Sequence, residues 1–262
     1  MTAMINLRDL RYSIEGKLLF DGASAIIPTG HKVGFVGRNG SGKTTLFKLI
    51  LEEINLDAGT ITIPRNSRIG GVSQEVPSSS QSLLNTVLEA HKERAELLKE
   101  AEKCQVPARI ADIQNRLTDI NAWSGEARAS SILSGLGFTT EGQLRPCSDF
   151  SGGWRMRVAL AGILFSEPDI LLLDEPTNYL DLEGSLWLEQ YLSNYPHTVI
   201  IISHDRELLN KSVNSILHLT NKNLKLYSGT YDSFSKQVLA QRMVLLSQSK
   251  KQETRNILNI TK

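Results

Sequence analysis

The most informative part of this sequence is Gly37-Arg38-Asn39-Gly40-Ser41-Gly42-Lys43-Thr44. It follows an apolar segment at residues 32–36 that predicts a β-strand, and it leads into an apolar-periodic segment at residues 45–51 that predicts a helix. A strand, a glycine loop and a helix in this order form the phosphate-binding pattern G-x-x-x-x-G-K-[ST]. Glycine lets backbone N–H groups reach phosphate oxygens, and the helix N-terminus adds partial positive charge. We therefore expect Lys43 to contact the β- and γ-phosphates of a nucleotide and the Thr44 hydroxyl to bind Mg²⁺.

A second motif is a short apolar run, residues 170–173, that ends in the carboxylates of Asp174 and Glu175. Such a run fits a buried parallel strand, and open α/β sheets bind ligands at the carboxyl ends of their strands. We expect Asp174 to hold Mg²⁺, directly or through water, and Glu175 to polarise the water that attacks the γ-phosphate. The alternative is a strand followed by a solvated acidic turn, which the phosphate loop disfavours.

The third motif, Ser151-Gly152-Gly153, precedes an apolar helical segment at residues 158–165. Ser151 suits the N-cap of that helix, and the motif forms a second corner where an anion can bind. One nucleotide does not need two such corners in one fold. The three motifs together resemble the ATP-binding-cassette (ABC) ATPases, in which this third motif reaches the ATP held by a second cassette. The resemblance implies an α/β fold with a phosphate-loop core, an antiparallel β subdomain and a helical subdomain.

The other motifs of ABC cassettes have counterparts at matching positions. Tyr12 lies where cassettes carry an aromatic side chain that stacks on adenine, although a strand-core tyrosine fits equally. Gln74 resembles the glutamine that senses Mg²⁺ and the attacking water, residues 178–181 resemble the D-loop that crosses to the other cassette, and His204 resembles the histidine that contacts the γ-phosphate. The resemblance implies catalytic roles for Glu175, His204 and Gln74, and metal contacts for Thr44, Gln74 and Asp174. It implies ATP contacts for Tyr12, Gly37, Asn39, Gly40, Ser41, Gly42, Lys43, Thr44, Thr45, Ser151, Gly152, Gly153 and Asp181.

Within the ABC ATPases, the details resemble the ABC-F proteins. Trp154 follows the Ser-Gly-Gly motif where most transporter cassettes have glutamine, and Phe150 precedes it where they have leucine. The stretches 149–161, 174–182 and 203–206 are also similar to ABC-F sequences. ABC-F proteins lack transmembrane domains, carry two cassettes in one chain, and act on the ribosome as translation factors or antibiotic-resistance proteins. The resemblance implies ATP and Mg²⁺ as cofactors, and a second cassette and the ribosome with its RNA as partners.

The patterns divide the chain into a cassette, residues 1–230, and a basic helical tail, residues 231–262. Residues 4–36 predict short strands separated by glycine turns at residues 15–16, 21–22 and 29–30. The tail matches the start of the linker between the two cassettes of ABC-F proteins. A solvated helix or disordered tail fits these residues as well as a helix that faces nucleic acid. Within this tail, the charged residues of the stretch 233–262 are Lys236, Arg242, Lys250, Lys251, Arg255 and Lys262 against Glu253.

Residues 83–145 predict a helical subdomain. Pro107 separates two charged helices and suits the first turn of the second, so the two helices form an antiparallel hairpin. A third helix is predicted at about residues 125–136. The hairpin, within residues 83–122, matches the arm inserted in ABC-F cassettes. Basic and acidic residues mix along it, so it could meet either RNA or protein.

Composition excludes several classes of protein. The chain has 262 residues and 40% hydrophobic residues, enough for the core of one large or two small domains. No apolar run approaches the roughly 20 residues that a membrane helix needs, and we expect no signal peptide because the N-terminus lacks a basic start and an apolar segment. Cys104 and Cys147 match no metal-site spacing and fit a reduced, cytoplasmic compartment.

The sequence holds no second phosphate loop, which leaves two interpretations. We expect the first half of a tandem protein, because the sequence stops inside a predicted helix; the alternative is a homodimer. The ATPase subunit of a membrane transporter would share all the ATP chemistry. Trp154, the helical insertion and the basic tail favour the ABC-F interpretation over it. Cassette ATPases of DNA repair or chromosome organisation would need a much longer coiled-coil insertion.

Overall fold

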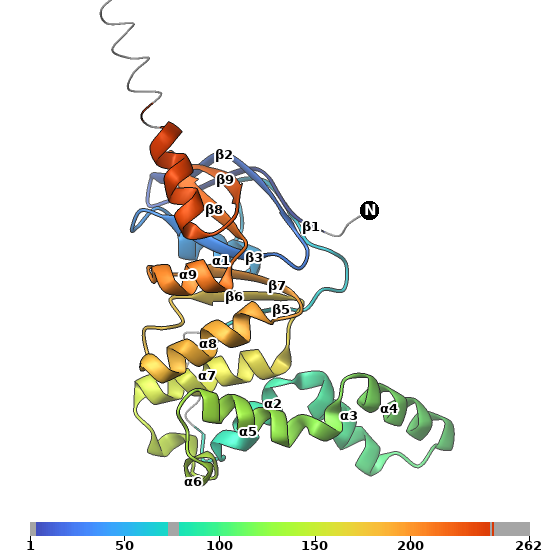
Figure 1. Ribbon diagram of the computed structural model, residues 1–262. Helices are drawn as coiled ribbons and strands as arrows, with labels where there is room; N and C mark the ends of the chain where they lie inside the picture. Colours follow the sequence, from blue (N-terminus) through green and yellow to red (C-terminus); the bar gives the residue numbers. More distant parts are fainter. Residues whose placement is uncertain (1–3, 73–78, 242, 244–262) are drawn as a thin grey trace, which may run out of the picture.

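The computed structural model describes residues 4–72, 79–241 and 243, which form two sheets and a set of helices (Figure 1). The smaller sheet is antiparallel, with the strand order β2-β1-β4. β1 and β2 pair from Met4 opposite Pro28 to Ile14 opposite Lys17, so they form one long hairpin. The bounds of these strands are β1 (Met4–Ile14), β2 (Lys17–Pro28) and β4 (Ala58–Thr62).

The prediction of short strands with glycine turns is wrong at Asp21-Gly22. Both residues lie inside β2, and Gly22 has a φ of 68°. The register shifts there, because Leu10 pairs with Ala23 while Arg11 pairs with Asp21. Gly22 is therefore the extra residue of a β-bulge, where the left-handed backbone conformation suits glycine.

The larger sheet carries the phosphate loop and has the strand order β5-β6-β7-β3-β8-β9. Its strands run parallel except β9, which pairs antiparallel with β8. All residues of β7 and all but the last of β6 are buried, as expected when both faces of a parallel sheet are covered. The bounds are β3 (Lys32–Gly37), β5 (Ile69–Gly71), β6 (Ile170–Asp174), β7 (Thr198–Ile202), β8 (Ser215–Thr220) and β9 (Asn223–Ser228).

Two clusters of buried side chains lie on opposite faces of this sheet. Along β6, Leu171 and Leu173 belong to one cluster, and Ile170 and Leu172 belong to the other, because side chains alternate between the faces of a strand. One cluster joins the sheet to α1 and to the antiparallel sheet, and the second joins it to most of the other helices. The helices concerned are α1 (Lys43–Ile50), α2 (Leu83–Ala90), α5 (Gly125–Gly135), α7 (Gly152–Ser166), α8 (Leu182–Ser193) and α9 (Arg206–Ser212).

The helices α3 (Lys92–Lys103) and α4 (Pro107–Asp119) form a hairpin that projects from the rest of the molecule (Figure 1). Pro107 occupies the first turn of α4, as predicted. Ile113 and Leu117 are buried against Leu97 and Leu98 in a small cluster of their own, so the hairpin has its own core. Its surface carries the ion pairs Arg109–Glu100, at 2.7 Å, and Arg116–Glu93. A short helix, α6 (Thr140–Gln143), follows α5.

A last helix starts at Tyr231, and its Phe234 packs against Tyr227 of β9 and His218 of β8. Several predicted residues fall outside the described part of the chain: Gln74, Arg242, Lys250, Lys251, Arg255 and Lys262. Where the structure describes the chain, no helix combines the length and the apolar composition needed to cross a bilayer. The α/β core with its phosphate loop, antiparallel sheet and helical part confirms the predicted fold class.

Candidate functional site

The phosphate loop runs from the end of β3 to the start of α1, and its conformation requires glycine. Gly40 and Gly42 have φ angles of 68° and 111°, where other residues are strained. A Cβ atom at Gly37 would lie 3.0 Å from the carbonyl oxygen of Leu219. The Ser41 Oγ is buried and has no hydrogen-bond partner among the described residues. Because buried polar groups are normally paired, this oxygen fits a loop built to take a phosphate ligand.

Two lysines lie over this loop. Lys43, the first residue of α1, folds back so that its Nζ donates to the carbonyl oxygens of Gly37 at 3.0 Å and Arg38 at 3.3 Å. Lys17, at the start of β2, donates to the carbonyl oxygen of Gly40 at 3.4 Å. Phosphate oxygens accept stronger hydrogen bonds from an ammonium group than neutral carbonyls do, so a bound nucleotide can draw both lysines toward it. Lys17 is not among the site residues predicted from the sequence, because no local pattern places this hairpin over the loop.

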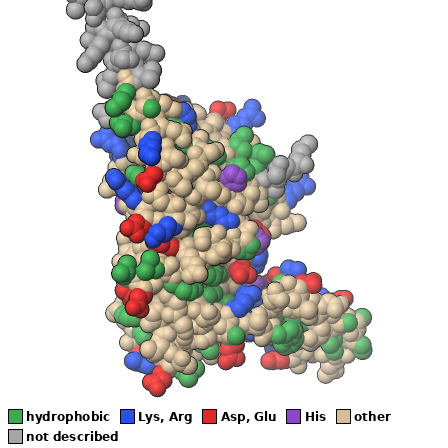
Figure 2. Space-filling model, in the orientation of Figure 1, with side chains coloured by type: hydrophobic (Ala, Val, Ile, Leu, Met, Phe, Trp, Pro, Cys, Tyr) green, Lys and Arg blue, Asp and Glu red, His purple; other side chains and the backbone are tan. Residues whose placement is uncertain are grey.

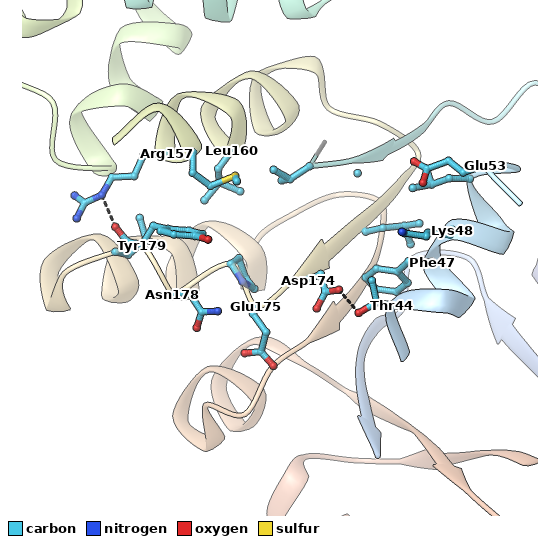
Figure 3. A pocket seen from close by; sticks show the side chains of 17 residues that line it. Thr44, Phe47, Lys48, Glu53, Arg157, Leu160, Asp174, Glu175, Asn178 and Tyr179 are labelled. Atoms are coloured by element: carbon cyan, nitrogen blue, oxygen red, sulfur yellow. Dashed lines mark hydrogen bonds between the residues drawn. The ribbon is translucent and has the colours of Figure 1, made fainter. Parts of the chain in front are cut away.

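The Thr44 hydroxyl and the Asp174 carboxylate meet beside the loop (Figure 3). Thr44 Oγ1 donates to Asp174 Oδ2 at 2.6 Å, which joins the start of α1 to the end of β6. Neighbouring ligands of an octahedral Mg²⁺ lie about 2.9 Å apart, given Mg–O distances of about 2.05 Å, so this pair needs little movement to hold the ion. Among the residues described, no group of three or more His, Cys, Asp and Glu side chains could hold a metal. Phosphate and water oxygens, the usual ligands of Mg²⁺, would supply the remaining contacts beside the predicted Gln74, which lies outside the described residues.

Glu175 follows Asp174, and its backbone adopts the left-handed region with a φ of 48°. Its N–H donates to the carbonyl oxygen of Ile202 at 2.8 Å, which fixes it against the end of β7. Its carboxylate accepts a hydrogen bond from the backbone N–H of His204 at 3.3 Å and lies 3.4 Å from Nε2 of the same residue. The structure thus brings the predicted base and the predicted histidine together. A costly backbone conformation at a residue other than glycine is typical of functional sites.

These groups face one pocket of about 400 Å³. Tyr12 does not line it; this tyrosine packs on the core of the antiparallel sheet, opposite Phe20. The strand-core alternative is therefore the arrangement seen, and adenine stacking by Tyr12 stays a prediction. Ile14 and Leu19, which the sequence analysis did not single out, supply apolar surface instead. The lining residues are Ile14, Lys17, Leu19, Asn39, Gly40, Gly42, Lys43, Thr44, Thr45, Asp174, Glu175, Ile202 and His204.

A second pocket, of about 500 Å³, shares Thr44, Asp174 and Glu175 with the first (Figure 3). Its other walls come from α1, α7 and the ends of β5 and β6, and from the segment after Glu175. The remaining lining residues are Phe47, Lys48, Leu51, Glu53, Gly71, Val72, Met156, Arg157, Leu160, Leu172, Pro176, Asn178, Tyr179 and Leu180. The carboxylates of Asp174 and Glu175 therefore lie between the two pockets. Gln74 lies outside the described residues, so its role stays a prediction.

The Ser151-Gly152-Gly153 motif begins α7, with Ser151 at the N-cap as predicted. Ser151 and Gly152 are exposed, and the Ser151 side chain makes no capping hydrogen bond within the described chain. None of the three residues lines either pocket. The motif is therefore an open helix N-terminus that the phosphate site of this chain does not use.

Asp181 is engaged inside its own chain. Its Oδ1 accepts the N–H of Gly184 at 2.9 Å, which caps α8, and its Oδ2 accepts from Arg157 Nη1 at 3.0 Å. The hydrogen bonds from Gly184 and Arg157 lower the pKa of the Asp181 carboxyl group. Asp181 does not line the phosphate pocket, and its contact with a nucleotide stays a prediction.

Comparison with curated proteins finds relatives over most of the chain. It is 44% identical to the probable ATP-binding protein YheS of Escherichia coli K12 over 237 residues, which cover 89% of this chain and 37% of YheS. It is 42% identical to ABC transporter F family member 3 of Arabidopsis thaliana, over 88% of this chain and 35% of that protein. It is 39% identical to human ATP-binding cassette sub-family F member 3, over 88% and 33%. The chain thus spans about a third of the length of these relatives.

Solved structures share the fold. An ATP-binding subunit of an ABC transporter has a TM-score of 0.64 at 17% identity, and the match covers 93% of this chain and 99% of that one. A dimeric ATP-binding cassette in a post-hydrolysis state, bound to ADP and Pi, has a TM-score of 0.62 at 20% identity, over 86% of this chain and 98% of that one. The family model described as ABC transporter matches residues 20–178. The chain therefore belongs to the ABC ATPase family, and it is a cassette of the ABC-F type.

Proposed function

We propose that this chain is a Mg²⁺-dependent ATP-hydrolysing cassette of an ABC-F protein that acts on the ribosome in the cytoplasm, as a translation factor or a ribosome-protection protein. The observation that carries the ATPase part is the convergence of Lys43, the Thr44–Asp174 pair and the Glu175–His204 pair on one pocket. The relatives named as F family members support the ABC-F part.

In this proposal the residues of the pocket divide the work on ATP. The N–H groups of the loop and Lys43 bind the β- and γ-phosphates, and Thr44 and Asp174 hold Mg²⁺, which withdraws charge from the phosphates. Glu175 accepts a hydrogen bond from the attacking water and polarises it. His204 lies against the Glu175 carboxylate, so it can hold that group in place and contact the γ-phosphate.

A second cassette completes the site in this proposal. The exposed start of α7, where the Ser151 side chain makes no capping hydrogen bond within the described chain, is available to the ATP of a partner cassette. That cassette would lie in a longer chain or in the second copy of a homodimer. Residues 178–181 would lie beside the start of α7 as the D-loop. The chain alone is then expected to bind Mg-ATP but hydrolyse it slowly, because no second helix N-terminus contacts its γ-phosphate.

The projecting hairpin of α3 and α4 is the proposed arm, and the chain from Tyr231 onward is the proposed start of the linker. Acidic and basic side chains are interspersed over the visible surface, including that of the hairpin (Figure 2). The two arginines Arg109 and Arg116 are both paired with glutamates of α3. The arm is therefore suited to protein as much as to RNA, and the basic tail is the better candidate for phosphate contacts.

Sedimentation with ribosomes tests the proposal. Glu175→Gln keeps the size of the side chain but removes the base, so a pair of cassettes that both carry this change should hold ATP and stay closed on their target. We expect this variant to pellet with ribosomes in Mg-ATP, to remain in the supernatant in Mg-ADP, and to bind less as salt rises. The matched control is Glu175→Gln combined with Lys43→Ala, which should fail to pellet in either nucleotide.

The same experiment with membrane vesicles separates the alternative. The ATPase subunit of a transporter would bind vesicles that carry its membrane partner and ignore ribosomes. A Glu175→Gln chain that behaves in this way, or one that pellets equally in ATP and ADP, would contradict the ribosomal proposal while leaving the ATPase part intact.

A further inference from the structure

Arg157 is a buried arginine whose guanidinium group joins three segments of the chain. It lies in the second turn of α7, and only 9% of the residue is exposed. Its Nε donates to the carbonyl oxygen of Tyr179 (Figure 3), and its Nη1 donates to the carbonyl oxygen of Leu136 at 3.1 Å and to Asp181 Oδ2 at 3.0 Å. One side chain thus ties the helix that starts with the Ser-Gly-Gly motif to the end of α5 and to the segment after β6.

The surroundings fit a flat, forked cation. The guanidinium carbon lies 4.3 Å from the centre of the Trp154 ring, within the range of a cation–π contact. Gly137 lies close beside the guanidinium group: its φ is 94°, and a Cβ there would lie 3.0 Å from Arg157 Nη1. Trp154 is itself held by Phe138, with ring centres 5.1 Å apart. A lysine could reach one of these acceptors but could not copy the fork.

The segment held by Arg157 begins with the proposed base. Glu175 follows β6 with a strained φ of 48°, and the segment ends at Asp181, which caps α8. Arg157 bonds two places near that end, the carbonyl of Tyr179 and the carboxylate of Asp181. The Arg157–Asp181 ion pair contributes little net stability, because 54% of the Asp181 side chain is exposed and solvent screens it, whereas the arginine fork specifies geometry. The contacts therefore serve to fix the path from Glu175 to α8.

We propose that Arg157 is a positioning residue, which keeps the segment from Glu175 to Asp181 in a fixed place relative to Ser151–Gly153 of α7. The inference rests on the proposed ATPase function. Arg157 makes no contact with the phosphate loop and does not line its pocket. Its loss should therefore slow the hydrolysis of bound ATP without weakening the binding of ATP.

The test compares Arg157→Ala, Arg157→Lys and Asp181→Asn with the unaltered chain and with Leu133→Ala. Leu133 is fully buried in α5 and makes no hydrogen bond with Arg157 or Asp181 through its apolar side chain, so Leu133→Ala is a control for lost stability. Asp181→Asn keeps an oxygen that can cap α8 but loses the charge that faces Arg157. Three quantities are measured: the Kd for Mg-ATP, the single-turnover rate of bound ATP, and hydrogen exchange in residues 176–184.

For Arg157→Ala we expect a hydrolysis rate about 10- to 100-fold lower, the scale expected when a change away from the chemistry displaces a catalytic group by about 1 Å, and a Kd within about twofold of that of the unaltered chain. Arg157→Lys should recover part of the rate, and Asp181→Asn should lose part of it. Hydrogen exchange in residues 176–184 should rise most in Arg157→Ala and less in Arg157→Lys and Asp181→Asn. Leu133→Ala should change neither the rate nor the local exchange.

Two results would overturn the inference. One is a wild-type rate in all the Arg157 and Asp181 variants; the other is an equal loss of rate in Leu133→Ala, which would make the effect one of general stability. If the unaltered chain does not hydrolyse bound ATP at all, the proposed ATPase function fails. In that case hydrogen exchange is the only test of the positioning role. Unchanged exchange in residues 176–184 of Arg157→Ala and Arg157→Lys would refute that role.

Discussion

Replacing Lys43 by alanine tests the phosphate loop, and the structure sets the size of the effect. The Lys43 Nζ lies over the loop, bonded to the carbonyls of Gly37 and Arg38 at 3.0 and 3.3 Å, where a β- or γ-phosphate would compete for it. A hydrogen bond to a charged group contributes about 1.5–3 kcal/mol, and two unit charges 4 Å apart attract by about 4 kcal/mol at an effective dielectric constant of 20. We expect Lys43→Ala to lose about 2–4 kcal/mol of binding free energy, which raises the Kd for Mg-ATP roughly 30- to 700-fold.

Titration calorimetry with Mg-ATP measures this loss. The matched control is Lys48→Ala, which removes the same charge from the same helix but from the wall of the neighbouring pocket. Because solvent and salt screen charges that are not in contact, the control should change the Kd by no more than about threefold. Urea unfolding checks that both variants are folded. Wild-type affinity in Lys43→Ala, or an equal loss in Lys48→Ala, would refute the assignment of this loop.

Three further outcomes are expected. Asp174→Asn should weaken binding of ATP in Mg²⁺ but not in EDTA, because it removes a charged metal ligand next to Thr44; calorimetry with and without Mg²⁺ shows this, and equal losses in both would contradict it. Leu117→Ala should destabilise the α3–α4 hairpin by about 2–4 kcal/mol, raising hydrogen exchange there while the Kd for ATP stays unchanged; a weaker affinity would show that hairpin and site are coupled. Burial is the main cause that lowers the pKa of His91 in the folded chain. As the pH falls, the unfolded chain therefore takes up a proton on this histidine before the folded chain does. The free energy of unfolding is then highest above about pH 6.5 and decreases as the pH drops below that value toward the folded pKa. His91→Asn keeps an acceptor for the Arg94 N–H and should flatten this fall in urea titrations from pH 7 to 5, whereas an unchanged slope would contradict the assignment.

The parts of the fold that could be predicted from the sequence are those that depend on residues adjacent in the chain. The strand, glycine loop and helix around Lys43 follow from local patterns, because positive φ angles, periodicity and an apolar strand are properties of neighbouring residues. The meeting of Thr44 with Asp174 followed from the rule that parallel strands present their carboxyl ends at one edge. The helices of the hairpin followed from their apolar spacing and from Pro107.

The remaining features depend on register and on contacts between distant segments. Asp21-Gly22 has the composition of a turn, yet it is a bulge inside β2, since the pairing of β1 with β2 decides where the chain reverses. Lys17 reaches Gly40, and Arg157 reaches Leu136, across separations of 23 and 21 residues. Nothing near Lys17 or Arg157 in the sequence encodes these contacts, so neither residue could be assigned before the fold was known.

Single-turnover hydrolysis of bound ATP by Glu175→Gln tests whether Glu175 is the base of an ATP-hydrolysing site. The variant should bind Mg-ATP with nearly unchanged affinity and hydrolyse it roughly 10²- to 10⁴-fold more slowly, the usual contribution of a general base. The control Glu53→Gln, in the wall of the second pocket, should hydrolyse ATP as the unaltered chain does. Hydrolysis at the unaltered rate in Glu175→Gln would contradict the account.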